Sequence, residues 1–544
     1  MESTFTLIDY LLFAGMLLSS LVIGVYFGFC GKTQTADEYL LGGKSMKVLP
    51  VGLSIIATHI SGLTLLGVPS EVYLYGANYF WICVVLVPTY FLTSYVYLPV
   101  LMKLQVPSVF EYIKLRFGKY PRLFASFLFT IQVLVYIPIV AFIPAIALSQ
   151  ATSINVHLIT PVVGIICVFY TTIGGFKAVI WTDAFQFVGI IGSVIAIFCL
   201  GVISVGGFET IWNRSLEGQR LDIFEVDPTV RNSFWSLFVG STFHYMCSAL
   251  LNQSAMQKFL AVPTPTHARK VILIFCLGFM VIILLVTCIG VIAYAKYWDC
   301  DPLSSNKIHK LDQLIPLMTT EVAGKSPGIP GMFIAGVFCA SLSILSVSFN
   351  SIACSVYEDF LTMFLPEDIS ENAVNRILKL IILVTGVVCI ALMFAFEDMT
   401  GVFDFSISIQ AITNGPLLGL FTLGILCPWA NALGSLCGGI IGLTFISVMV
   451  IGNQWYKSKG FVDYCLKPVS TNGCSFPYNK TNVIDSFEGN TFVLFALSNW
   501  YNTLIGATVV VVIASFISCL TNNKNNRVDV KLLSPSIRRL VSNT

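Results

Sequence analysis

Long apolar blocks separated by short polar segments run along most of the chain. There are about thirteen such blocks, at residues 8–29, 48–69, 79–102, 121–149, 158–174, 182–205, 234–258, 271–297, 331–361, 376–396, 402–426, 430–452 and 498–520. A helix of about 20 apolar residues crosses the roughly 30 Å hydrocarbon core of a bilayer. The pattern therefore predicts an all-α polytopic membrane protein, for which an even number of twelve or fourteen spans is the main alternative.

The composition strengthens this prediction and removes other classes of protein. Of the 544 residues, 56% are apolar and 11% are charged, and the net charge is +2. Soluble domains carry about 25% charged residues, so a soluble enzyme, a secreted disulfide scaffold and a nucleic-acid-binding protein are excluded. The chain lacks a P-loop, an HExxH motif, paired CxxC motifs and a nucleotide-binding fingerprint, and its five histidines lack metal-ligand spacing. We therefore expect neither an enzyme nor an ATP-driven pump.

The distribution of basic residues predicts the topology. Most of the 30 Lys and Arg residues, Lys258 among them, lie on the inner side if the N-terminus is outside and thirteen spans follow. This orientation predicts a plasma-membrane protein with a cytosolic C-terminus. We expect one transmembrane domain at residues 1–520, including a first block that is retained and not cleaved as a signal peptide. Residues 521–544 are expected to be a disordered cytosolic tail.

The same orientation places two glycosylation sequons and three loop cysteines outside. The sequons Asn213-Arg-Ser and Asn479-Lys-Thr are candidates for glycosylation. A third match at Asn252 lies at the end of a span, so we treat it as a chance match. Cys465 and Cys474 are candidates for a disulfide bridge in an oxidising compartment.

The second and seventh spans carry polar and small residues in the middle of apolar segments. Thr58, His59, Ser61, Gly62 and Thr64 interrupt the second span, and residues 240–248 do the same in the seventh. Discontinuous helices at corresponding positions of two structural repeats mark the binding site of many transporters. Close helix packing through small residues is the alternative explanation.

The ninth span contains five serines and one asparagine within residues 340–351. Their hard oxygen atoms suit an alkali cation, although such serines also bond back to their own helix. Two carboxylates lie near span ends, Asp183 at the inner start of the sixth and Asp404 at the outer start of the eleventh. An ionisable residue near the hydrocarbon suggests function, whereas a stabilising position at a helix start is the alternative.

Several motifs together make the chain resemble the sodium:solute symporter family. The most specific is Gly174–Asp183 with Gln186, and the others are Ala36–Met46, Glu111–Tyr112 with Arg116–Phe117, Asn252–Gln253, Gln257–Lys258 and Asn414–Gly419. The resemblance covers about residues 35–430. Val68–Gly76 is similar to the branch of the family that carries monocarboxylates, iodide and water-soluble vitamins.

The resemblance implies thirteen helices with an inverted repeat of five plus five, here about residues 48–205 and 234–426, in which helices 2 and 7 are broken. It implies a sodium site at Ala57, Ile60, Ala340 and Ser343, with Ser61 as an additional ligand. The family usually has a second hydroxyl directly after Ser343, where this chain has Ile344. Positions that line the substrate cavity in this branch correspond to His59, Thr64, Ile82, Cys83, Tyr245 and Phe403.

These residues predict a symporter that uses Na⁺ to import a small organic anion, a monocarboxylate or a vitamin-like acid, by alternating access. Asp183 would lie on the path by which sodium leaves toward the cytosol. The expected partners are the sodium ion, the organic anion and the bilayer, and the oligomeric state stays open. An uncoupled sensor or channel is one alternative, favoured by Ile344. A sodium-coupled sugar or polyol symporter is another, but it should line its cavity with several amide or charged residues, and the sequence offers few.

Overall fold

The computed structural model describes residues 5–29, 36–152, 154–323, 326–366, 369–394, 402–459, 466–474, 493–521 and 528–541. Within these ranges the protein is helical and has no β-strand. The long helices and the segments of broken helices are α1 Leu7–Phe29, α3 Val48–His59, α4 Val68–Tyr75, α5 Trp81–Leu92, α6 Leu98–Leu104, α8 Lys119–Thr152, α9 Val156–Val205, α11 Ser241–Tyr245, α12 Gln253–Leu260, α13 Pro265–Lys296, α15 Ile329–Ser355, α16 Glu371–Met393, α17 Val402–Leu426, α18 Ala432–Ser458 and α20 Asn502–Leu520. Shorter helices lie in the connections, namely α2 Ala36–Leu41, α7 Glu111–Phe117, α10 Phe208–Glu217, α14 Leu314–Ala323, α19 Val493–Ala496 and α21 Pro535–Val541.

The lengths of these helices confirm a polytopic membrane protein. Ten described helices are long and apolar enough to cross a bilayer, and the broken pair Val48–His59 and Leu63–Tyr75, bent by 60°, makes up to eleven. The 50 residues of α9 would extend for about 75 Å if straight, more than twice the hydrocarbon thickness. Gly175 has a non-helical φ of 62° there, in the segment 174–182 where the sequence predicts a boundary between two spans. The total of thirteen spans stays a prediction.

The break in the second span lies where the sequence predicts it, whereas the break in the seventh span lies after the predicted stretch 240–248, which is helical. The second span is interrupted between His59 and Leu63. The seventh consists of helical turns from Ser236 to Leu250 and then α12, with an extended Asn252 (φ −83°, ψ 166°) between them. The side chain of Asn252 accepts a hydrogen bond from the N–H of Ala255 and thereby caps α12. Each of these two spans is therefore divided into two halves.

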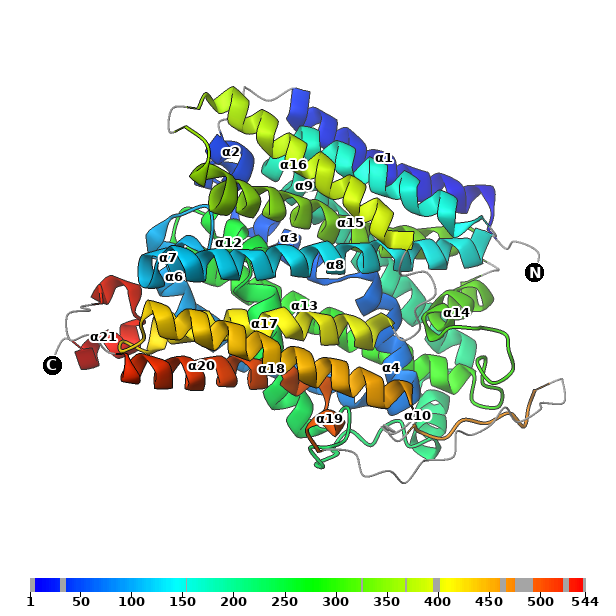
Figure 1. The fold of residues 1–544 in the computed structure, drawn as a ribbon. Coiled ribbons are helices and arrows are strands. Elements are labelled where there is room, and N and C mark those ends of the chain that lie inside the picture. The colour runs from blue at the N-terminus through cyan, green and yellow to red at the C-terminus, as the bar shows by residue number, and fades with distance from the viewer. Residues whose placement is uncertain are drawn as a thin grey trace.

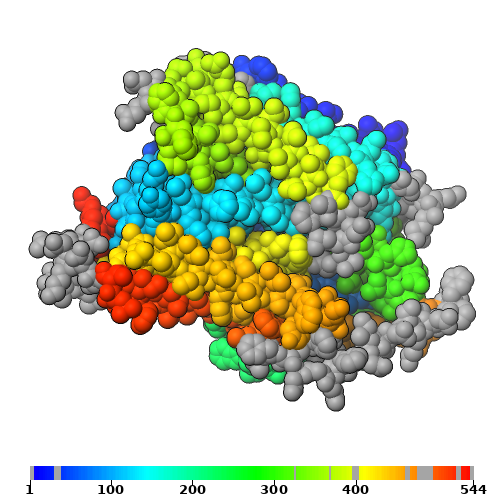
Figure 2. All heavy atoms as spheres, viewed as in Figure 1, coloured from blue at the N-terminus to red at the C-terminus, as the bar shows by residue number. Residues whose placement is uncertain are grey.

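The long helices lie side by side in one bundle (Figure 1). In this view α1, α9, α15 and α16 lie on one side of α8, and α13, α17, α18 and α20 lie on the other. The short helices α2, α7 and α21 lie at one end with the C-terminus, whereas α10 and α14 lie at the other end with the N-terminus. Figure 2 shows α16, α8, α18 and α20 as bands across one face.

Helix α15 occupies the interior of the bundle. It packs against α9, α8, α1 and α3, and 94% of the residues in its most apolar window are buried. Its serines therefore face other helices and not lipid, which matters because serine hydroxyls in this environment can serve a ligand or a neighbouring side chain.

The disulfide prediction is corrected by the structure. Cys474 is bonded to Cys300, so it does not pair with Cys465, which lies outside the described residues. The N–H of Asp301 donates to the carbonyl of Ser470 at 2.9 Å, and the N–H of Gly473 donates to that of Asp299 at 2.9 Å. These bonds lay two loops that are distant in sequence beside each other, and short spacing along the chain could not indicate this pairing.

Part of the C-terminal tail is folded onto the bundle, where the sequence predicts disorder. Residues 528–541 contain a 3-10 turn and α21, and Leu532 and Leu533 are buried. The Tyr112 hydroxyl donates to the carbonyl of Leu532 at 3.1 Å, and the N–H of Ser534 donates to that of Ile425 at 3.0 Å. Burial of two leucines and these bonds explain the order in a segment of polar composition.

Candidate functional site

A cavity of about 140 Å³ lies beside the break in the second span. Its wall contains four of the six predicted substrate residues, namely His59, Thr64, Tyr245 and Phe403. Ile82 and Cys83 lie outside the wall. Both are buried on α5, and the Cys83 thiol donates to the carbonyl of Met280 at 3.6 Å. The structure thus brings together residues from both broken helices and from α17.

The break in the second span is held open by two side chains that cap each other. The N–H of Ser61 donates to the Thr64 hydroxyl at 3.3 Å, and the N–H of Thr64 donates to the Ser61 hydroxyl at 3.2 Å. In a continuous helix these two N–H groups would bond to the carbonyls of Ala57 and Ile60. Reciprocal capping therefore leaves both carbonyls, two of the predicted sodium ligands, without their helical donors.

A buried hydroxyl on α15 adjoins this break. The Ser341 hydroxyl is buried and has no hydrogen-bond partner among the described residues. A Cβ atom placed on Gly62 would lie 3.3 Å from the Ser341 oxygen, so the broken backbone and α15 are in direct contact here. Ile344 is one turn further along α15, on the same helix face, and it lines the cavity. The broken backbone of the second span and the Ser341 hydroxyl of the ninth span, α15, thus lie together near the cavity.

Two further predicted ion residues, Ser343 and Asp183, belong to a buried cluster. The Asp183 carboxylate accepts hydrogen bonds from the hydroxyls of Ser343 and Ser54, each at 2.7 Å, and the Lys258 ammonium is 3.1 Å away. Lys258 also donates to the carbonyl of Ser54 at 3.0 Å and to the Thr58 hydroxyl. The sequence assigned Lys258 to the inner-facing charges, but its side chain is 1% exposed and Asp183 is fully buried.

The upper wall of the cavity is aromatic. The Tyr79 and Tyr245 hydroxyls are 3.2 Å apart, and the Tyr79 ring lies 6.2 Å from Phe403 and 6.1 Å from Trp500, measured between ring centres. The ring of His244 contacts Trp500 at 5.5 Å. His244 belongs to the polar stretch of the seventh span, so the sequence offered a signal for it, although it was not among the predicted substrate residues. Trp500 had no signal in the sequence, because its distance of 90 or more residues from every other wall residue is bridged only by the fold.

Amide side chains also line the cavity, contrary to the expectation that few would be found. Gln132, Asn252 and Gln410 belong to the wall. The Gln132 amide is tied to α17 by a hydrogen bond of 2.9 Å to Asn414. None of the described wall residues is Asp, Glu, Lys or Arg. Apart from the protonation state of its two histidines, the cavity wall is therefore uncharged, and it combines polar with aromatic and other apolar side chains.

Asp404 belongs to an ion-pair network at the end of the bundle that carries α10 and α14. Arg231 lies 2.7 Å from Asp404 and 2.8 Å from Glu71 on α4, and Lys457 on α18 also pairs with Asp404. The Asn499 amide donates to Asp404 at 2.8 Å. A stabilising position at a helix start is thus only part of its role, since the network ties α4, the C-terminal half of the second span, to α17 and α18.

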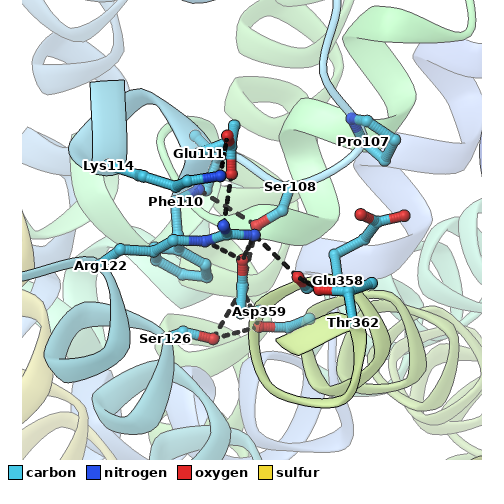
Figure 3. A network of polar contacts seen from close by, with 12 residues as sticks. Pro107, Ser108, Phe110, Glu111, Lys114, Arg122, Ser126, Glu358, Asp359 and Thr362 are labelled. Atoms are coloured by element: carbon cyan, nitrogen blue, oxygen red, sulfur yellow. Dashed lines mark hydrogen bonds and ion pairs between the residues drawn. The ribbon is translucent and has the colours of Figure 1, made fainter. Parts of the chain in front are cut away.

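A second polar network lies at the opposite end (Figure 3). Arg122 on α8 pairs with Glu111 at 2.6 Å and with Asp359 at 2.7 Å. Asp359, which follows α15, accepts hydrogen bonds from three serines, Ser108, Ser126 and Ser355. The Figure 3 network therefore joins α8, α15 and the loop that precedes α7.

That loop also holds α12, the C-terminal half of the seventh span. The Gln253 amide on α12 donates to the carbonyl of Pro107 at 2.8 Å and accepts from the N–H of Val109 at 2.7 Å. Gln253 therefore connects α12 to the Figure 3 network through the backbone on both sides of Ser108.

Three comparisons describe what the chain is similar to. The model of the Sodium:solute symporter family matches residues 39–442. Sodium-coupled monocarboxylate transporter 1 of Homo sapiens is 33% identical, covering 97% of this chain and 90% of the human protein. Sodium-coupled monocarboxylate transporter 2 of Danio rerio is 34% identical, covering 98% and 86%. The fold resembles that of a Na⁺-coupled sialic acid symporter in a substrate-bound outward-open state, with a TM-score of 0.77, 22% identity and coverage of 95% and 98%.

Proposed function

Because the chain belongs to the sodium:solute symporter family, it is a sodium-coupled symporter and not an enzyme, and we propose that it imports a small monocarboxylate by alternating access. The observation that carries the proposal is the reciprocal capping of Ser61 and Thr64, which frees carbonyl oxygens directly beside an uncharged cavity. An ion and an organic solute bound this close together would each influence the same broken helix.

We assign sodium to the oxygens at the break and on α15. The carbonyls of Ala57 and Ile60, the unpartnered Ser341 hydroxyl and Ser343 supply hard oxygen atoms, which suit a small alkali cation. With an ion there, α3 and α15 are held together. Its loss toward Asp183 would free the inner half of the second span to move.

We assign the organic substrate to the cavity of about 140 Å³. A cavity of about 150 Å³ holds a molecule the size of benzene, so an acid of about six to eight heavy atoms or fewer is favoured over a vitamin-sized anion or a sugar. The sequence argued against a sugar because it offered few amide residues for the cavity, and the amides in the wall remove that argument. The small volume of the cavity now argues against a sugar instead. His59 and the Tyr79–Tyr245 pair provide polar groups for a carboxylate without a basic side chain, and both relatives are named as monocarboxylate transporters.

We place the protein in the plasma membrane with the N-terminus outside and the C-terminus in the cytosol. The two termini lie at opposite ends of the bundle (Figure 1). The Cys300–Cys474 bridge supports an extracellular location for its loops, since disulfides persist in oxidising compartments. Asn213 is exposed on α10 at the N-terminal end, whereas Asn252 is a helix cap within the bundle, and Asn479 lies outside the described residues.

The test is uptake of radiolabelled lactate into proteoliposomes that contain the purified protein. We expect uptake to require an inward sodium gradient, to fall to background when choline replaces sodium, and to be inhibited by other short monocarboxylates but not by a disaccharide. Thr64→Val should raise the half-saturating concentrations of both sodium and lactate, because it removes the capping hydroxyl and a cavity wall group together. Thr444→Val, at an exposed hydroxyl on α18, is the control. Lactate uptake that is equal in sodium and choline would contradict the proposal.

An uncoupled sensor or channel is the second candidate, because Ile344 offers no oxygen and Asp183 is already paired with Lys258. It predicts sodium-independent lactate flux, or binding without flux, in the same vesicles.

A further inference from the structure

The contacts of Lys258 go beyond those of a structural ion pair. Its ammonium has hydrogen-bond or ion-pair contacts with Ser54, Thr58 and Asp183, which include a backbone carbonyl, a hydroxyl and a carboxylate oxygen. An ammonium has three donors, so all of them are used. These are the hard oxygen ligands that also suit a sodium ion. The amino group therefore occupies a site built as a cation site.

The same contacts join three separate helices. Lys258 lies on α12, the inner half of the seventh span, Ser54 and Thr58 on α3, the inner half of the second, and Asp183 on α9. Ser343 on α15 donates to the other oxygen of the Asp183 carboxylate. One ammonium thus ties the inner halves of both broken helices to the helix that carries Asp183.

The charge of the cluster is balanced without a bound ion. One carboxylate and one ammonium, both fully buried, sum to zero. If Lys258 stays in place, a sodium ion that reaches Asp183 adds an unpaired positive charge beside the ammonium. In an environment of low dielectric constant this is strongly unfavourable. The two cations therefore compete for the carboxylate.

We propose that Lys258 is a tethered competitor of sodium, which neutralises Asp183 when the ion is absent and has to withdraw when the ion reaches the carboxylate. Withdrawal breaks the link between α12, α3 and α9, so arrival of the ion loosens the inner halves of both broken helices. Return of the ammonium after sodium leaves restores the link. The inference rests on the proposed function, because it names the positioning residue that connects ion release to helix movement.

The test compares how sodium stabilises the purified protein in detergent, without any transport. Thermal denaturation is followed in sodium chloride against choline chloride at constant ionic strength for wild type, Lys258→Met, Lys258→Gln and the double variant Lys258→Met with Asp183→Asn. Without its ammonium, Asp183 needs another cation. We expect the half-saturating sodium concentration to fall at least tenfold in Lys258→Met and Lys258→Gln. The double variant should lose this gain in sodium affinity, because it has no carboxylate charge at position 183 to attract the ion.

Lys270→Met is the matched control, since Lys270 is exposed at the start of α13 and should leave the sodium response unchanged. If Lys258→Met does not fold, Lys258→Gln, which keeps two donors, gives the same comparison. A sodium response in both single variants equal to that of wild type would overturn the inference, even if wild-type lactate uptake requires sodium. Conversely, tighter sodium binding in the single variants together with sodium-independent uptake would uphold the competition and refute the proposed coupling.

Discussion

Replacing Ile344 with serine tests whether sodium binds between the broken second span and α15. Ile344 is 4% exposed and lies one turn from the unpartnered hydroxyl of Ser341, on the face of α15 that contacts the break at Gly62. Serine at this position would add a second hydroxyl to the same face. If sodium binds to the freed carbonyls of Ala57 and Ile60, the new oxygen lies within the group of candidate ligands.

The size of the effect follows from the chemistry of the added ligand. A hydrogen bond between neutral groups contributes about 0.5–1.5 kcal/mol and one to a charged group about 1.5–3 kcal/mol. One oxygen ligand gained in a site shielded from water should therefore lower the half-saturating sodium concentration between about threefold and about a hundredfold. The loss of a buried isoleucine costs about 2–5 kcal/mol of folding stability when alanine replaces it, so thermal stability is measured alongside.

The assay is the sodium dependence of lactate uptake in proteoliposomes, at saturating lactate, for wild type, Ile344→Ser, Ile344→Thr and Ile344→Ala. Alanine removes the same bulk and adds no oxygen, so a gain seen with serine and threonine but not with alanine is due to the hydroxyl. The half-saturating lactate concentration at saturating sodium should change by a smaller factor than the half-saturating sodium concentration. Identical sodium dependence in the serine and alanine variants would refute a sodium site at this face of α15.

Three further predictions concern other parts of the molecule. Glycosidase should reduce the apparent mass of the protein made in animal cells. This change should disappear when Asn213 and Asn479 are both replaced, but it should persist when only Asn252 is replaced. A mass change that survives the double replacement would refute the topology. Burial raises the pKa of the Asp312 carboxyl, just before α14, from 3.8 to about 6. The contribution of this carboxyl therefore lowers the folding stability of the protein as pH rises between about 4 and 6. Asp312→Asn should therefore raise the thermal midpoint at pH 8 but not at pH 4, and an equal gain at both values would contradict this. Gln253→Leu should weaken the hold of α12 on the loop before α7 and increase the accessibility of the buried Cys247 to a membrane-impermeant thiol reagent added on the cytosolic side. Unchanged labelling would show that this contact does not close the inner end.

Much of the architecture was readable from the sequence because its physical signal is local. Apolar blocks of about 20 residues predict membrane helices wherever they occur, since the bilayer imposes the length. The polar interruption at residues 58–64 predicts the break in the second span, because Ser and Thr offer the backbone alternative hydrogen bonds. The serine-rich run of the ninth span likewise predicts a helix with a polar face. These signals depend on residues a few positions apart.

What only the tertiary structure decided involves residues that are distant in the chain. Lys258 was counted with the inner loop charges, yet it lies buried against Asp183, because three helices that start far apart in sequence meet there. Cys474 pairs with Cys300 across 174 residues, and Trp500 lines a cavity whose other wall residues are all at least 90 positions away in the chain. A carboxylate has the same sequence signal whether it caps a helix, as was considered for Asp404, or sits in an ion-pair network. The partner of a buried charge is set by how whole helices pack, and packing energy depends on contacts that no local pattern of residues encodes.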